Sequence, residues 1–385
     1  DSRIHKCVTF VRYVSLRFME NGGDLHHSFN AASIQTYNAR KAQSTLYNIA
    51  FDNHLFFMSP SSTTAKQIYV APMMAWTDRH CRYLHRLYAP HVVLFTEMVT
   101  TPALLHGEQW HLLEYSPAEQ PLILQLGGSE PDELARCASR AQALGFAEIN
   151  LNVGCPSERV QRGAFGACLM REPELVGRCI AAMQREVDIP CTVKCRLGVD
   201  DDDSDTFLWR FVDHVAAHGC GHFYVHARKA ILSGLSPAQN RSIPPLQHER
   251  VAALKARTPE LAITLNGGIT DVAGAVEALE WADGVMIGRA AYHNPELLGQ
   301  LEREVYDAAY TFDVREILHR YQGYIESQMA RGVKLHALTR HLLHSLSGRP
   351  GARRFRQLLS DQNRLRNNDP VLVTEALAQV FGAAA

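Results

Sequence analysis

The sequence has almost no net charge, no long apolar run and neither of the common nucleotide-binding loops. Its 385 residues carry 39 Lys and Arg against 40 Asp and Glu, for a formal net charge of −1. No uncharged apolar stretch reaches the ~18 residues that a membrane-spanning helix needs. The patterns G-x-G-x-x-G and G-x-x-x-x-G-K-[ST] are also missing, so a Rossmann dinucleotide site or a P-loop is unsupported. We therefore expect a globular protein that does not bind membranes.

The nine cysteines do not have the spacing of a disulfide framework. Several of them lie inside apolar runs, which is typical of reduced thiols, and we expect a cytoplasmic protein. Free cysteine is among the most buried residue types. Core positions are therefore expected for the thiols that fall in helical or strand patterns, namely Cys137, Cys179, Cys191 and Cys220.

No group of residues in the sequence has the spacing of a metal site. His214 and His218 stand four apart on a predicted helix, but no nearby carboxylate or cysteine completes a ligand set. Cys191 and Cys195 fall on the same side of a predicted strand, where filling of the core is the simpler interpretation. The acidic run 200–205 lacks the glycine and the terminal glutamate of a calcium loop, so we interpret it as a loop with a helix cap. We expect no metal.

Positive charge is concentrated near the C-terminus. Residues 315–369 hold eleven Lys and Arg against four Asp and Glu, whereas the rest of the chain has 28 basic and 36 acidic residues. This asymmetry predicts either a polyanionic partner bound by the basic segment or a helical region with a solvated basic face. The charge count alone does not separate the two.

Short apolar runs alternate with longer helical patterns from residue 67 onward, and the runs end in polar or glycine residues. Helical patterns such as 130–145 and 172–187 intervene, and Gly145 is placed to end the first of them. Eight such units in roughly 240 residues predict a (β/α)8 TIM barrel, an α/β fold whose usual size is about 250 residues. The eight runs are 67–73, 92–98, 122–128, 148–154, 192–198, 222–228, 262–268 and 284–290.

Strand signals stop after residue 295, and helical patterns such as 315–330 and 334–346 follow. Residues 1–57 show no sustained periodicity, and we expect the natural chain to start at Met58. The predicted parts are an N-terminal extension over 1–66, the barrel over 67–305 and a small basic helical domain over 306–385.

Polar or glycine residues stand at the end of nearly every predicted strand. In a TIM barrel the carboxyl ends of the strands form the active site, so these residues together outline a pocket. The glycines of "NGGI" (266–269) and "GRA" (288–290) follow the last two strands. There, backbone N–H groups can approach a phosphate, and Arg289 can add a charge-assisted bond. The alternative is that these glycines only form tight turns.

If that phosphate belongs to flavin mononucleotide (FMN), other strand ends gain roles. The amides of Gln125 and Asn152 can both donate and accept, as the uracil-like edge of the flavin requires. Lys194 could stabilise the negative charge of the reduced flavin, or it could pair with Glu97 on a neighbouring strand. Both interpretations of Lys194 stay open.

Long motifs of the sequence resemble those of the flavin-dependent tRNA-dihydrouridine synthases. They are "YVAPMMAWTDRHCRYLHR" (69–86), "NLNVGCPSERVQRGAFGACLM" (150–170) and "NGGI" with "MIGRA", while "HARKAILSGLSPAQNRSIPPL" (226–246) resembles the A-type subfamily in particular. The resemblance implies FMN, reduction of the flavin by NADPH, and a uridine of the tRNA D-loop as substrate, U20 and U20a in A-type members. It implies FMN contacts from Pro72, Met73, Met74, Gln125, Lys194, His226, Asn266, Gly267, Gly268, Gly288 and Arg289.

The same resemblance implies that Cys155 is the proton donor and that Asn152 lies beside the target base. It also implies tRNA contacts from Arg241 and from three residues of "GARRFRQ" (351–357), which are Arg353, Arg354 and Arg356. Further basic residues are expected on loops at the active face, either as RNA contacts or as ordinary surface charges. These are Arg159, Arg162, Arg228 and Lys229.

Dihydrouridine forms when a hydride and a proton add across the C5=C6 bond of uracil. Because this bond is conjugated to the C4 carbonyl, the hydride is expected at C6 and the proton at C5. A thiol with an ordinary pKa of ~8.5 is mostly protonated at neutral pH and can act as the acid. Gly154 is expected to permit the turn that carries Cys155 over the barrel mouth, and Pro156 to limit the freedom of that turn.

Two other functions fit parts of the sequence. One is an FMN-dependent dehydrogenase or reductase of a free pyrimidine, of the dihydropyrimidine or dihydroorotate type, against which the basic C-terminal segment argues. The other is a non-catalytic RNA-binding barrel, which would not take up FMN. We expect a monomeric oxidoreductase that uses FMN and NADPH on tRNA.

Overall fold

The computed structural model of the chain describes residues 66–382. The predictions of an N-terminal extension and of a start at Met58 fall on residues 1–65, which lie outside the described residues. Within 66–382, no helix combines the length and the apolar character that crossing a membrane requires.

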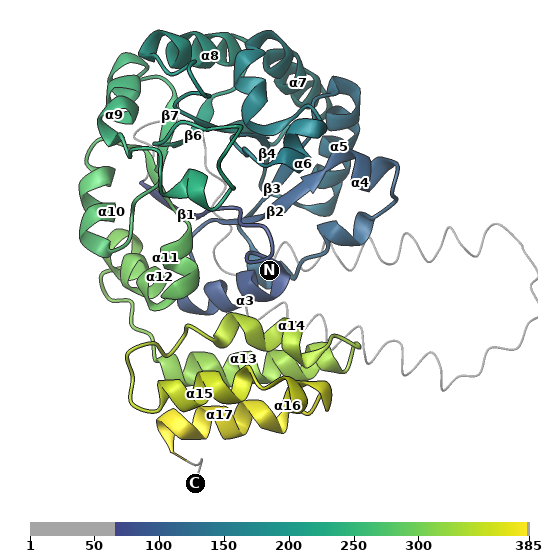
Figure 1. The fold of residues 1–385 in the computed structure, drawn as a ribbon, viewed down its shortest axis with the longest axis vertical. Helices are drawn as coiled ribbons and strands as arrows, with labels where there is room; N and C mark the ends of the chain where they lie inside the picture. Colours follow the sequence, from purple (N-terminus) through teal and green to yellow (C-terminus); the bar gives the residue numbers. More distant parts are fainter. Residues whose placement is uncertain (1–65, 383–385) are drawn as a thin grey trace, which may run out of the picture. The chain divides into compact units, whose positions relative to one another are not determined.

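Eight parallel strands form the centre of the structure over residues 66–382, and every run predicted from the sequence overlaps one of them (Figure 1). The order in the sheet is β1-β8-β7-β6-β5-β4-β3-β2. Val93, next to the start of β2, exchanges two backbone hydrogen bonds of 2.9 Å with Ile68 and Val70 of β1, which closes the sheet into a barrel. This confirms the predicted fold class. The strands are β1 (Gln67–Val70), β2 (Leu94–Thr100), β3 (Leu122–Gly127), β4 (Glu148–Val153), β5 (Cys191–Arg196), β6 (His222–His226), β7 (Ala262–Asn266) and β8 (Gly284–Ile287).

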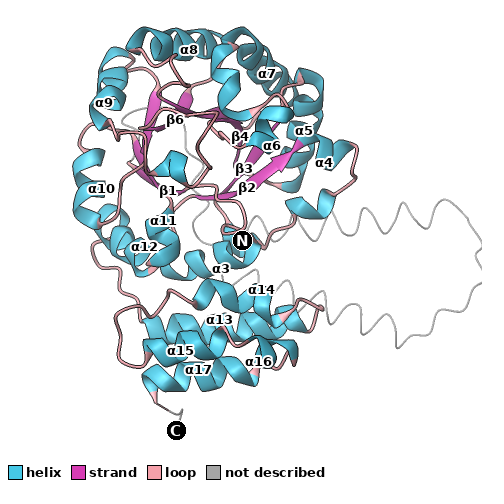
Figure 2. Cartoon of the chain, viewed as in Figure 1, coloured by secondary structure: helices cyan, strands magenta, loops and turns pink. Residues whose placement is uncertain are grey.

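Helices surround the barrel on its outside (Figure 2). Gly145 ends α5 with a φ of 90°, the left-handed conformation predicted for it. Ser204 caps α8 by accepting a hydrogen bond from the Phe207 N–H, so the acidic run does precede a capped helix. The helices are α3 (Arg79–Tyr88), α4 (Thr101–Leu105), α5 (Pro131–Leu144), α6 (Glu158–Arg162), α7 (Pro173–Glu186), α8 (Asp205–Ala217), α9 (His248–Arg257), α10 (Val272–Leu279), α11 (Arg289–His293) and α12 (Glu296–Leu301), followed by a π-helical turn over Glu302–Tyr306.

Apolar side chains fill the space between the barrel and these helices, and the four cysteines assigned to the core are all buried there. Cys191 and Cys195 are buried too, which confirms that they fill the core. His214 and His218 stack on each other at 4.8 Å between ring centroids. Over residues 66–382, no cluster of three or more His, Cys, Asp or Glu side chains could hold a metal ion.

Five further helices follow the barrel. The helix predicted over 334–346 is shorter than expected, because α14 ends at Thr339 and a 3-10 turn continues to Leu342. Within that turn, Arg340 and His341 both contact Asp78 of the barrel, and a regular helical pattern in the sequence carries no information on such a contact. The helices are α13 (Val314–Met329), α14 (Leu335–Thr339), α15 (Ala352–Leu359), α16 (Gln362–Arg366) and α17 (Val371–Phe381).

Asp78 joins the barrel to the C-terminal helices. Its carboxylate caps α3 by accepting from the backbone N–H groups of His80 and Cys81, each at 2.9 Å. It also pairs with Arg340, and Nε2 of His341 lies 3.0 Å from its Oδ1. Burial alone would raise the pKa of Asp78, but the hydrogen bond and the charge of His341 and the Cys81 N–H hold it well below its usual range. A single carboxylate therefore serves a helix cap and an ion pair between distant segments.

Replacing Asp78 by Ala should lower the free energy of unfolding by about 3–5 kcal/mol, because it removes the cap of α3 and leaves the buried His341 and the partly exposed Arg340 without their carboxylate. Urea denaturation measures this loss. Asp361→Ala is the matched control: Asp361 caps α16 in the same way but pairs with no cation of another element, so a loss of ~1 kcal/mol is expected. Because Asp78 has a lowered pKa in the folded state, the difference between wild type and Asp78→Ala should shrink as pH falls below ~4. Equal losses in the two variants would contradict the joining role.

Candidate active site

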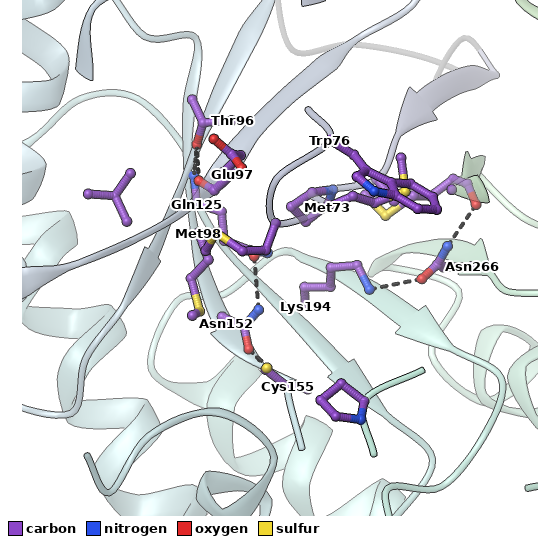
Figure 3. Close-up of a pocket in the computed structure, with 18 of the residues that line it drawn as sticks. Met73, Trp76, Thr96, Glu97, Met98, Gln125, Asn152, Cys155, Lys194 and Asn266 are labelled. Carbon is purple, nitrogen blue, oxygen red and sulfur yellow. Dashed lines mark hydrogen bonds between the residues drawn. The ribbon is translucent and has the colours of Figure 1, made fainter. Parts of the chain in front are cut away.

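The carboxyl ends of the strands open into one cavity of about 1220 Å³ (Figure 3). A typical small-molecule pocket has a volume of about 300–1,000 Å³, so this one has room for a cofactor together with a base. All eleven residues predicted to contact FMN line it, and so do Cys155, Asn152 and Arg241. The barrel thus brings together residues from seven strand ends, and Glu97 of the remaining strand, β2, lines the same cavity. The eleven are Pro72, Met73, Met74, Gln125, Lys194, His226, Asn266, Gly267, Gly268, Gly288 and Arg289.

Two adjacent glycines after β7 form the most constrained turn of the cavity wall. Gly267 and Gly268 have φ angles of 109° and 79°, in the left-handed region that other residues rarely adopt. A Cβ at Gly268 would also lie 2.3 Å from the side chain of Leu246. The backbone conformation of this turn therefore requires glycine, independently of any ligand. Gly288 differs, because a Cβ there would make only ordinary contacts of 3.7 Å and 3.8 Å with Met73 and Ala71.

Arginines without carboxylate partners gather at the rim beside this turn. Arg289 donates to the backbone oxygen of Arg241 at 3.1 Å, and within residues 66–382 neither guanidinium has an Asp or Glu partner. Burial and the neighbouring Arg289 lower the pKa of Arg241. Arg228 donates to the carbonyls of Ser242 and Pro244 and has a pKa lowered by burial and by Arg289. Positive charges held this close to one another and to exposed backbone fit an anion such as a phosphate.

Lys194 lies deeper in the cavity and does not pair with Glu97. Its Nζ donates to Oδ1 of Asn266 at 2.8 Å, and Nδ2 of Asn266 donates to the backbone oxygen of Met286 at 2.8 Å. Burial and the charge of Arg196 lower the pKa of Lys194 to about 8. Glu97 instead accepts from the N–H of Ala75, and burial raises its pKa. Of the two interpretations of Lys194, the pairing with Glu97 is wrong.

Hydrogen bonds between two side chains and the backbone hold the Cys155 loop at the end of β4. The Oδ1 of Asn152 accepts from the N–H groups of Gly154 and Cys155, at 3.2 Å and 3.0 Å. Arg196 donates its Nε–H to the Gly154 oxygen at 2.8 Å. The half-buried thiol of Cys155 lies 3.5 Å from the hydroxyl of Ser157. The thiol therefore stands on a fixed backbone at the cavity wall.

Gly154 was expected because of the turn that carries Cys155, and this reason is wrong. Its backbone lies outside the left-handed region, so the turn itself does not require glycine. A Cβ at this position would instead lie 3.3 Å from the backbone oxygen of Lys194 on the neighbouring strand. Glycine is favoured here because the loop runs close against β5.

Several of the basic residues expected to contact RNA lie away from the cavity. Lys229 lies 3.2 Å from Oδ2 of Asp203 and donates to the oxygen of Asp200, so it holds the acidic loop. Arg162 lies 3.5 Å from Glu158 on the same helix. The side chain of Arg159 falls outside the described part of the chain. Three more of these basic residues lie on α15, and they are Arg353, Arg354 and Arg356. They have no carboxylate partner among the described residues.

The cavity also contains residues that the sequence did not identify. Trp76 stacks on Tyr292 with 4.6 Å between ring centroids, and Trp76 and His293 both line the rim. The segment 109–114 contributes further lining residues from the connection between β2 and β3. These positions belong to long connections rather than to strand ends. No spacing in the sequence shows which side chains of such a connection fold over the barrel mouth.

The profile of the family described as "Dihydrouridine synthase" matches residues 69–381. The tRNA-dihydrouridine(20/20a) synthase of Pasteurella multocida is 52% identical over 293 residues, which cover 76% of this chain and 89% of that protein. The protein of the same description in Xanthomonas axonopodis is 54% identical over 293 residues, covering 76% and 87%. The one in Vibrio cholerae is 48% identical over 320 residues, covering 83% and 98%.

Proposed function

We propose that this chain, which belongs to the dihydrouridine synthase family, reduces uridines 20 and 20a of tRNA to 5,6-dihydrouridine. The proposal rests on one cavity, which the half-buried thiol of Cys155 lines. The deep part of its wall carries amide side chains and Lys194, and its rim carries the glycine turn and Arg289. These are the parts that a flavin and a uracil require. The relatives described as tRNA-dihydrouridine(20/20a) synthases support the choice of substrate.

The cavity residues fit FMN. The turn at Gly267 and Gly268 and the unpaired guanidinium of Arg289 would hold its phosphate. The amide of Gln125, of which one N–H and one oxygen lone pair are used within the protein, would face the polar edge of the ring. The ammonium of Lys194 would lie where the reduced ring is most negative. When bound there, FMN reduced by NADPH would supply the hydride for C6 of the uracil.

Cys155 supplies the second hydrogen. When C6 has gained its hydride, C5 holds the electron pair of the former double bond, and the Sγ–H bond breaks to give C5 its proton. The thiolate then regains a proton from water. The held loop keeps the thiol at the cavity wall, where Asn152, another lining residue, would lie beside the base. A positioned acid of this kind typically contributes about 10²–10⁴-fold to the rate.

Residues outside the cavity must also bind the tRNA. A stacked uracil cannot reach the bottom of a barrel, so its nucleotide has to be extruded at a cost of a few kcal/mol. We propose that the exposed arginines of α15 contact the phosphate backbone and offset this cost. Arg241 at the rim would contact the extruded strand.

Cys155→Ala should keep FMN and tRNA binding but lower dihydrouridine formation by about 10²–10⁴-fold, because only the proton donor is removed. Single-turnover assays on unmodified tRNA measure the loss. Cys168→Ala is the matched control, since Cys168 is the other half-buried thiol among residues 66–382 and its Sγ–H donates to the Phe165 oxygen at 3.1 Å. Unchanged turnover in Cys155→Ala would remove Cys155 as the donor.

Replacing Arg353, Arg354 and Arg356 together by Ala should weaken tRNA binding. The slope of log affinity against log salt concentration should fall by about one for each arginine that contacts a phosphate. The control changes the net charge equally on the outer barrel helices α5 and α7, by replacing three exposed residues, Arg136, Arg178 and Arg185. If both triple variants lose the same affinity, the basic helices have no specific part in binding.

A further inference from the structure

A continuous row of buried side chains runs down the inside of the barrel from the Cys155 loop. At its upper end, Oδ1 of Asn152 accepts from the backbone N–H groups of Gly154 and Cys155. The Nδ2 of Asn152 donates to Oε1 of Gln125 at 2.8 Å. The Nε2 of Gln125 donates in turn to Oδ1 of Asn150 at 2.8 Å. Figure 3 shows the upper members of this row.

The row continues to the opposite end of the strands. The Nδ2 of Asn150 donates to Oγ1 of Thr192 at 2.9 Å, and the Thr192 hydroxyl lies 2.6 Å from Oε1 of Glu148. The same hydroxyl lies 3.4 Å from the Ile149 oxygen, so its single proton goes to the nearer carboxylate. Tyr224 donates to Oε1 of Glu148 as well, at 3.0 Å. Asn150 is fully buried and Thr192 almost so.

Both ends of the row dictate one direction of hydrogen bonding. Backbone N–H groups can only donate, so Asn152 must present its oxygen to the loop and its NH2 group to Gln125. Each following amide must then accept from above and donate below. At the lower end, Oε1 of Glu148 accepts the proton of Thr192, so this end requires the same order. An amide that turned over anywhere in the row would place two donors or two acceptors face to face.

We propose that Glu148, Thr192 and Asn150 are positioning residues, which orient the amides of Gln125 and Asn152 and thereby hold the Cys155 loop in its place above the cavity. None of the three touches the cavity itself. The catalytic meaning of this placement rests on the proposed function, in which Cys155 is the proton donor. The placement itself is a property of the protein without substrate.

The direction does not depend on the protonation state of Glu148. Burial raises its pKa to about 7, against the opposing hydrogen bonds of Thr192 and Tyr224. A proton on Oε2 leaves Oε1 free to accept from both hydroxyls, so the row keeps its order on either side of neutral pH. The carboxyl group matters as an acceptor at a fixed position.

Hydrogen exchange of the backbone N–H groups of Gly154 and Cys155 tests the proposal in the full-length protein as purified. Thr192→Val keeps the size of the side chain but removes the hydroxyl, so the amides above it lose their fixed orientation. Exchange in the peptide that covers residues 150–157 should become about tenfold faster, since the two N–H groups lose their acceptor for part of the time. Thr192→Ser restores the hydroxyl and should restore slow exchange.

The matched control is Thr264→Val. Thr264 is equally buried on β7, but its hydroxyl contacts His222 at 2.8 Å and takes no part in the row. Exchange at the loop should stay as in the wild type. Equal acceleration in Thr192→Val and Thr264→Val, or no acceleration in Thr192→Val, would overturn the proposal.

A second variant serves if Thr192→Val does not fold. In Asn150→Leu, which keeps the approximate size of the side chain, Gln125 loses the oxygen that accepts from its Nε2, so its amide is no longer held in one orientation and exchange at the loop should again rise. Slow exchange in this variant would overturn the proposal too. Neither result depends on dihydrouridine formation, so a failure of the proposed function, seen as full turnover in Cys155→Ala, would be recognised separately.

Discussion

The two hydrogen bonds that the Asn152 side chain accepts from the Cys155 loop are the interaction on which the site depends. They join Asn152, one residue before the end of β4, to the first residues of the loop that carries the thiol. A proton donor must lie within about an ångström of its productive position to be effective, and a side chain on a free loop would not. Arg196 supports the same loop from β5 by donating to the Gly154 oxygen. Strand geometry, rather than loop sequence, therefore sets the position of Cys155.

Barrel closure is what gathers the rest of the site. Because parallel strands all end at the same rim, residues from eight distant segments meet around one cavity. The wall then divides by chemistry: amides and Lys194 lie deep, while the glycine turn and Arg289 lie at the rim. The cations have no carboxylate partners in the described part of the chain, so they are left for anionic ligands. The C-terminal helices add further positive charge outside the cavity and are joined to the barrel through Asp78.

Strand ends were predictable because two signals mark each of them. One is the short apolar run, and the other is the polar or glycine residue at which the run ends. All eight runs overlap a strand, and the eleven residues expected to contact the cofactor line one cavity at the strand ends. Contacts between distant segments were not predictable: Asp78 with His341, Trp76 with Tyr292, and Lys194 with Asn266 rather than Glu97. The buried row does have a signal in the sequence. Glu148, Asn150 and Asn152 are polar at every second residue of one strand, the spacing of side chains that point into a barrel.

A comparison of two substrates tests whether the protein acts on tRNA. Purified protein with FMN and NADPH is incubated with unmodified tRNA and, separately, with free uracil at equal concentration. Sequencing locates dihydrouridine in the tRNA, and NADPH consumption measures turnover on both substrates. We predict dihydrouridine at positions 20 and 20a and no measurable reduction of free uracil, because a free base lacks the phosphates that we propose the basic helices contact. Efficient reduction of uracil with the tRNA left unmodified would contradict the account.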